Sequence, residues 1–192
     1  MVNRNILGAL AAAMIIGATG CVSREVDPGF TPLPPAKPVS FPYGWEGAYA
    51  GELEIMGTED VAMRAAMSLT IRSTPAPDRW SWVIQYEGQP AREYEIVVVD
   101  SAIGHYRIDE GNSVTIDGRL MGDTFLSPFG MESTLLSAKY QLVPEGIKFE
   151  IVTTSLDPLP PLSTEPNAQT VASYPVQGYQ RALLWRIPEG IR

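Results

Sequence analysis

The chain has 192 residues, of which 45% are hydrophobic, and its 22 acidic and 14 basic side chains give a formal net charge of −8. This acidic balance disfavours nucleic acid and anionic lipid surfaces as partners, since both select proteins with a basic surface. Cys21 is the only cysteine and His105 the only histidine. These counts exclude a disulfide within the chain, and they leave only oxygen ligands for a metal ion.

The first 20 residues have the three-part order of a secretory signal peptide. Arg4 gives a positive start, residues 6–20 carry no charge, and small residues end the segment. The uncharged run is shorter than the ~20 apolar residues that span a bilayer as a helix. The sequence therefore predicts that residues 1–20 are a signal peptide, removed on export.

The residues Ala18-Thr19-Gly20-Cys21 resemble the lipobox of bacterial lipoproteins, with alanine where leucine is commoner. The resemblance implies cleavage before Cys21 and acylation of its thiol, which would anchor the protein to a membrane. The alternative is an ordinary secretory signal beside a chance cysteine. Val22 and Ser23 follow where an aspartate would imply retention at the inner membrane. The same resemblance therefore implies the outer membrane, with the protein facing the periplasm.

Residues 21–42 are predicted to be an acylated cysteine followed by a proline-rich linker. Six prolines lie between residues 22 and 42, and such a composition favours an extended, semi-rigid spacer. Residues 43–192 remain as one domain, which is long enough to bury a sizeable core.

Hydrophobic and polar residues alternate with a period of two through this domain, which is typical of half-buried strands. Ten segments show the pattern, at 48–56, 63–73, 80–87, 91–100, 104–109, 113–118, 120–126, 135–143, 146–154 and 180–187. Turn-forming residues at 87–90, 109–112, 117–118 and 144–146 separate successive strands. Short turns join antiparallel neighbours, and a closed barrel buries one sheet face while leaving no edge. We therefore predict an all-β fold, a single antiparallel up-and-down barrel of about eight to ten strands.

The start of the first strand, Gly44-Trp45-Glu46-Gly47, resembles the Gly-x-Trp motif of lipocalins. In that family the tryptophan closes one end of the barrel against a basic residue of the last strand. The resemblance implies this role for Trp45, with Arg181 or Arg186 as the basic partner. Residues 108–118 and 125–140 also resemble lipocalin-like bacterial domains. These likenesses imply a calycin-like fold and no particular activity.

No catalytic residue is predicted. A nucleophile activated by a base would need His105, which alternates with Tyr106 and Ile108 and so lies on the face opposite these apolar residues. A calcium ion could bind the acidic and amide side chains between residues 109 and 117. Their spacing differs from that of an EF-hand, however, and a tight turn explains the same composition. The sequence therefore predicts no metal and no cofactor.

A ligand site is predicted at one end of the barrel. Arg92 shares a face with Tyr94, and if that face points inward, the guanidinium needs a partner. This partner is a ligand carboxylate or phosphate, an acid of the barrel wall, or solvent at the strand end. Trp80, Trp82 and Tyr86 would line the path of the ligand. The proline-rich loop 155–178 is the seventh connection counted from 87–90, so it is expected at the same end as Arg92.

Two functions remain open on the sequence alone. In the first, the protein is a non-enzymatic, membrane-anchored envelope lipoprotein whose barrel binds a small apolar or amphiphilic ligand. In the second, it is a structural or assembly lipoprotein whose barrel is filled by its own side chains and whose outer surface binds an envelope protein. Methionine and aromatic side chains suit both, because they can fill a small barrel or adapt to a ligand.

Overall fold

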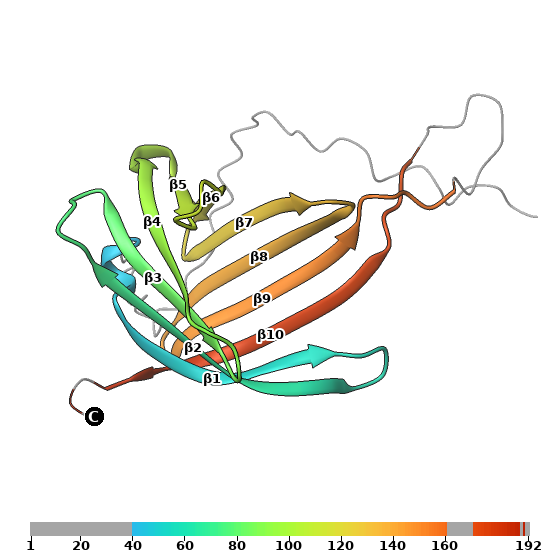
Figure 1. The fold of residues 1–192 in the computed structure, drawn as a ribbon, viewed down its shortest axis with the longest axis horizontal. Helices are drawn as coiled ribbons and strands as arrows, with labels where there is room; N and C mark the ends of the chain where they lie inside the picture. The colour runs from blue at the N-terminus through green and yellow to red at the C-terminus, as the bar shows by residue number, and fades with distance from the viewer. Residues whose placement is uncertain (1–39, 161–170, 189, 191–192) are drawn as a thin grey trace, which may run out of the picture. The chain divides into compact units, whose positions relative to one another are not determined.

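A computed structural model describes residues 40–160, 171–188 and 190. This part of the chain forms a closed antiparallel barrel of ten strands with up-and-down connections (Figure 1). The predicted fold class is thus confirmed. The strands are β1 (Gly47–Met56), β2 (Val61–Ser73), β3 (Arg79–Tyr86), β4 (Arg92–Asp100), β5 (His105–Asp109), β6 (Thr115–Met121), β7 (Thr124–Met131), β8 (Thr134–Val143), β9 (Gly146–Ser155) and β10 (Val176–Ile187).

The two ends of the barrel differ in what closes them. At one end, named here the proximal end, the chain enters through a short 3₁₀ turn, η1 (Tyr43–Trp45), just before β1. The β2–β3, β4–β5, β6–β7 and β8–β9 connections lie at the same end. The other five connections lie at the opposite, distal end, among them those that join β3 to β4 and β9 to β10. No helix in the described part of the chain has the length and apolar character needed to cross a membrane.

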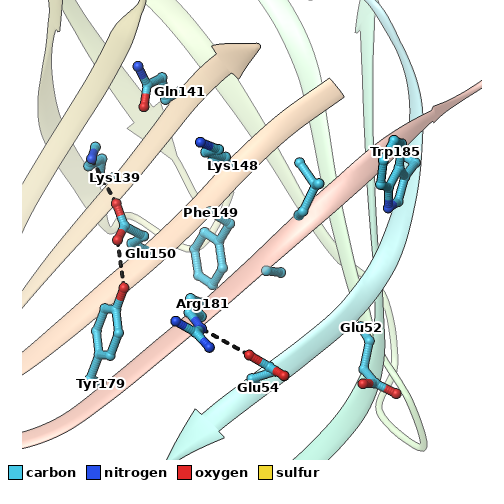
Figure 2. A pocket seen from close by; sticks show the side chains of 12 residues that line it. Glu52, Glu54, Lys139, Gln141, Lys148, Phe149, Glu150, Tyr179, Arg181 and Trp185 are labelled. Atoms are coloured by element: carbon cyan, nitrogen blue, oxygen red, sulfur yellow. Dashed lines mark hydrogen bonds and ion pairs between the residues drawn. The ribbon is translucent and has the colours of Figure 1, made fainter. Parts of the chain in front are cut away.

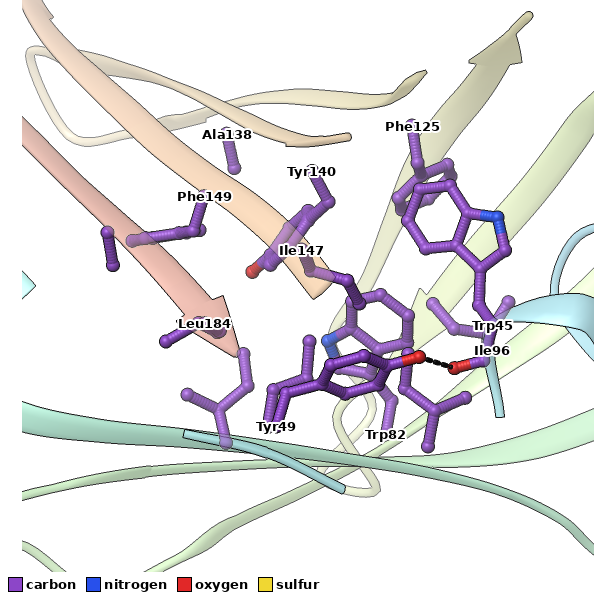
Figure 3. Packing of buried hydrophobic residues seen from close by; sticks show 14 of the residues in the cluster. Trp45, Tyr49, Trp82, Ile96, Phe125, Ala138, Tyr140, Ile147, Phe149 and Leu184 are labelled. Atoms are coloured by element: carbon purple, nitrogen blue, oxygen red, sulfur yellow. Dashed lines mark hydrogen bonds between the residues drawn. The ribbon is translucent and has the colours of Figure 1, made fainter. Parts of the chain in front are cut away.

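Aromatic side chains fill the proximal half of the barrel (Figure 3). The ring of Phe41 lies 4.8 Å from Trp45, 4.8 Å from Tyr106 and 4.9 Å from Phe125, measured between ring centroids. The Tyr106 hydroxyl also donates to the Phe41 carbonyl oxygen, at 3.1 Å. Trp45 is only 1% exposed. The segment before β1 is therefore a plug that belongs to the core.

This plug extends the packed part of the chain upstream of residue 43. Phe41 is 6% exposed and Pro42 is fully buried, so the packed domain includes two residues that the sequence analysis placed in the linker. The proline-rich composition hid them, because Pro42 continues the run of linker prolines while Phe41 gives no periodic signal by itself.

The sequence also misplaced the turn between β6 and β7. Asp117-Gly118 lies inside β6, and the turn falls at residues 122–123, where Gly122 has the left-handed φ of 65°. Gly118 serves packing instead, since a Cβ there would lie 2.2 Å from Cζ of Phe125. An Asp-Gly pair is a strong turn signal, but here the glycine makes room for an aromatic ring.

Charged side chains form a row along the outer wall across five neighbouring strands. Register pairs Lys139 with Glu150, Glu150 with Arg181, Arg181 with Glu54, and Glu54 with Arg64. The charges alternate, and three of the four neighbouring pairs make ion pairs, at 2.7, 2.9 and 3.2 Å. The hydrogen bond from Arg181, followed by that from Arg64, lowers the pKa of Glu54. This charged row crosses the β1–β10 seam that closes the barrel.

Candidate functional site

Three of the five predicted ligand residues lie together at the distal end. Arg92 pairs in register with buried Ile84, and Tyr94 pairs with buried Trp82, so both side chains lie on the inner face of the barrel. The guanidinium carbon of Arg92 is 5.2 Å from the ring centroid of Tyr86, at the end of β3. Its Nη2 also donates to Oε1 of Gln89, at 3.2 Å. The β9–β10 connection lies at this same end.

The other two predicted residues lie elsewhere, which corrects the expected ligand path. Trp82 is 0% exposed and belongs to the core. Trp80 lies at the proximal end, where its Nε1 donates to Oε1 of Glu46 at 2.9 Å. The alternation of residues correctly predicted that Trp80, Trp82 and Tyr86 lie on one face. However, Trp80 and Tyr86 are six residues apart, which corresponds to ~20 Å along a strand. A ligand held at Tyr86 therefore does not reach Trp80.

A third tyrosine, which sequence reasoning missed, lies beneath Arg92 and Tyr94. Tyr140 on β8 is 4% exposed, and its ring centroid is 5.1 Å from that of Trp82. Burial raises the pKa of Tyr140 strongly, and the nearby phenols of Tyr86 and Tyr94 raise it further, against the smaller lowering effects of the Trp82 indole N–H and of Arg92. The phenol is therefore neutral at physiological pH and can donate a hydrogen bond. Its strand alternates like the others, so no local pattern indicates that β8 faces β3 and β4 across the barrel.

The indole N–H of Trp82 is buried beside the Tyr140 hydroxyl, whose pKa it lowers, but it makes no hydrogen bond of full geometry among the described residues. A buried donor without a partner costs ~1–3 kcal/mol, so such groups call for an explanation. Figure 3 shows Trp82 and Tyr140 together among the buried residues of the core. A polar atom of a ligand could satisfy the indole N–H only if it reached this depth.

The inner wall at the distal end is apolar and partly exposed. Ile55, Tyr86, Tyr94, Ile116 and Ile151 pack against the core without being fully buried. Figure 3 shows that the inward residue on β8 beside Tyr140 is the small Ala138. This arrangement combines apolar walls with an arginine and three phenols, which is the chemistry of a site for an amphiphile.

The proximal end is held by Arg186 rather than Arg181. Arg186 Nη2 donates to the Glu46 carbonyl oxygen and to the Tyr49 hydroxyl, both at 2.8 Å, and the Tyr49 hydroxyl donates to the Trp45 carbonyl oxygen at 2.7 Å. The guanidinium carbon lies 5.2 Å from the Tyr49 ring. The cation therefore packs on Tyr49, and it reaches Trp45 through the Tyr49 hydroxyl. Arg181 points outward and bonds to Glu54, because its position in β10 has the opposite parity.

His105, Asp109 and Asp117 are each engaged in local hydrogen bonds or ion pairs. His105 Nε2 lies 2.9 Å from Oδ1 of Asp117, and Arg107 Nε lies 3.4 Å from the same oxygen. Asp109 accepts from the Gly111 amide and pairs with Arg79, and these contacts, in that order, lower its pKa. Within residues 40–160, 171–188 and 190, no three such side chains cluster as metal ligands would.

Cys21 and the rest of the lipobox lie outside the described residues. Comparison with known proteins adds no assignment, since neither the models of protein families nor the sequences of curated proteins match this chain.

Proposed function

We propose that the distal end of the barrel binds a small amphiphilic molecule with an anionic head group. The observation that carries the proposal is the position of Arg92 and Tyr94 on the inner face, above the buried phenol of Tyr140. Arg92 and the phenols would bind the head group, since charge-assisted hydrogen bonds are the stronger kind. The partly exposed isoleucines would cover the tail, at ~0.8 kcal/mol for each buried CH₂.

The packing supports a short ligand in this proposal. Trp82, Phe125 and Trp45 are completely or almost completely buried and fill the proximal half, so a tail would lie against the partly exposed residues of the distal end. The same packing is what a barrel filled by its own side chains would need. That second candidate, an assembly protein that binds an envelope protein through its outer wall, predicts no saturable binding at the distal end.

Binding of a matched pair of ligands tests the proposal. The full-length chain, held in phosphatidylcholine nanodiscs, should bind a dansylated undecanoic acid probe. Dodecanoic acid should displace this probe from the protein, and dodecanol should displace it more weakly. Arg92→Gln should weaken dodecanoic acid binding ~10-fold or more, because a lost charge-assisted bond is worth ~1.5–3 kcal/mol. It should leave dodecanol binding nearly unchanged.

Arg107→Gln is the matched control, because it removes the same charge from the outer wall. Empty nanodiscs give the background from partition into lipid. Equal loss of dodecanoic acid binding in both variants would mean a general effect of charge. Absence of saturable binding by the unmodified protein would favour the filled barrel.

We also propose that acyl chains on Cys21 hold this barrel at the periplasmic face of the outer membrane. Cys21→Ser should then leave an uncleaved precursor, because the cleavage of a lipoprotein signal depends on the modified cysteine. Mass spectrometry of the purified protein and fractionation of the membranes measure this directly. A processed Cys21→Ser protein in the outer-membrane fraction would contradict the anchor while leaving the ligand site untested.

A further inference from the structure

A second hollow lies on the outer wall of the barrel, away from the proposed amphiphile site. It has a volume of about 640 Å³ and spans β8, β9, β10 and β1 (Figure 2). Sites for small ligands have volumes of roughly 300–1,000 Å³, so this outer hollow is large enough for one. Its lining comes mainly from outward positions of the strands, whose inward neighbours form the core.

The outer hollow has one apolar wall. Trp185 on β10 is 56% exposed, and Leu183, two residues earlier, lies on the same face. Trp185 is the most exposed tryptophan of the described chain, since Trp45 and Trp82 are buried and Trp80 is half-buried. An exposed indole offers a flat apolar surface together with one N–H donor, which suits recognition better than packing.

The charges that surround this indole balance one another. Three acidic residues (Glu52, Glu54, Glu150) and three basic residues (Lys139, Lys148, Arg181) line the outer hollow, so the lining has a formal charge of zero. Glu52 pairs with Arg64 at 3.0 Å, and the other two acids pair within the charged row. A charged ligand would therefore gain no net electrostatic attraction here, and it would have to break one of these ion pairs to bind.

Polar groups stand directly beside the apolar floor. Register places Lys148 next to Leu183 on one side and next to Gln141 on the other. The Gln141 amide nitrogen also donates to the Asp123 carboxylate oxygens, at 3.3 and 3.4 Å. Ammonium and amide groups donate hydrogen bonds, while carboxylates such as that of Glu52 keep lone pairs that accept them. A ligand that fits must therefore be neutral, with many groups that both donate and accept, and with one apolar face.

Sugars have this combination of properties. We propose that the outer hollow binds a neutral carbohydrate, with one sugar ring stacked on the Trp185 indole and its hydroxyl groups bonded to Lys148, Gln141 and Glu52. The C–H face of a pyranose covers the aromatic ring, and its hydroxyls donate to carboxylates and accept from ammonium and amide groups. This site is independent of the amphiphile site, because the barrel wall separates an outward from an inward face.

Fluorescence quenching by iodide tests the proposal on the full-length chain. Iodide reaches exposed indoles, so Trp185 should account for most of the quenching. The protein is held in lauryldimethylamine oxide, a detergent without a sugar head group. Chitotetraose and cellotetraose, both neutral, should protect the fluorescence in a saturable way, and the anionic tetragalacturonate should bind at least several-fold more weakly. Trp185→Ala should weaken sugar binding at least 10-fold, as measured by calorimetry.

Two further variants make the outcome specific. Tyr43→Ala removes an aromatic side chain that is 69% exposed at the proximal end, so it should leave sugar binding unchanged. Lys148→Met should weaken binding several-fold while keeping the hollow covered by a side chain of similar length. The proposal is overturned if neither neutral sugar protects Trp185, if tetragalacturonate binds best, or if Trp185→Ala binds as well as the unmodified protein.

Discussion

Replacement of Phe41 by alanine is expected to lower the free energy of unfolding by ~3–5 kcal/mol, as truncation of a buried aromatic side chain does. The ring contacts Trp45, Tyr106 and Phe125 within 4.9 Å, so its loss leaves a cavity at the proximal end of the barrel. Folded domains have a total stability of ~5–15 kcal/mol, so this is a large share of it. Urea unfolding followed by tryptophan fluorescence measures the change.

Tyr43 is the matched control for Phe41. It is an aromatic residue of the same plug but is 69% exposed, so Tyr43→Ala should change stability by less than about 0.5 kcal/mol. Equal stability of both variants would show that the plug does not pack in solution. In that case the domain would begin at residue 43, as its sequence suggested.

Replacement of Gly51 by alanine is expected to be nearly as costly. A Cβ at this position would lie 2.2 Å from the carbonyl oxygen of Leu183 and 3.1 Å from its carbonyl carbon. These atoms are backbone atoms of the neighbouring strand β10, so they cannot move away as a flexible side chain would. We expect a loss of about 3 kcal/mol, the upper end of the range for overpacking. Thermal unfolding should then occur about 6–12 °C lower for a domain of this size.

Gly178→Ala provides the comparison, because it adds the same methyl group to a glycine of β10 that pairs with β9. Its Cβ would lie 3.6 Å from the side chain of Thr153, which is an ordinary contact. We expect this variant to be as stable as the original protein or slightly more so, since alanine restricts the unfolded chain. A Gly51→Ala protein with unchanged melting temperature would mean that β1 and β10 are farther apart than described.

The alternation of residues predicted the fold well, because every strand of a barrel has the same local pattern of inward apolar and outward polar side chains. Eight of the ten strands match predicted segments to within a few residues, and the two errors involve β6 and β7. There the sequence has two competing signals, Asp117-Gly118 for a turn and Gly122-Asp123 for another. Only the tertiary contact of Phe125 with Gly118 decides between them, and no local pattern contains that contact.

The candidate site was predictable in part for a related reason. Periodicity identifies the face on which Arg92, Tyr94 and Tyr86 lie, and the count of turns places them at one end. It does not identify which residue of another strand lies at the same height, because the strands are tilted and staggered. For this reason Tyr140 was missed and Trp80 was placed too near the ligand. The outer hollow could not be predicted, because its outward-facing polar residues have the same pattern as ordinary solvent-exposed positions of a strand.

The charged row across the β1–β10 seam has a consequence for how the barrel closes. Glu54 and Arg181 are 127 residues apart in sequence, so their strands can pair only after nearly the whole domain has emerged from synthesis or export. A slip of two residues in this pairing would place Glu54 opposite Tyr179 or Leu183 instead of Arg181. The alternating charges therefore favour the correct register of β1 against β10. This strand pair has the largest sequence separation in the barrel, so the entropy cost of closing its loop is the greatest.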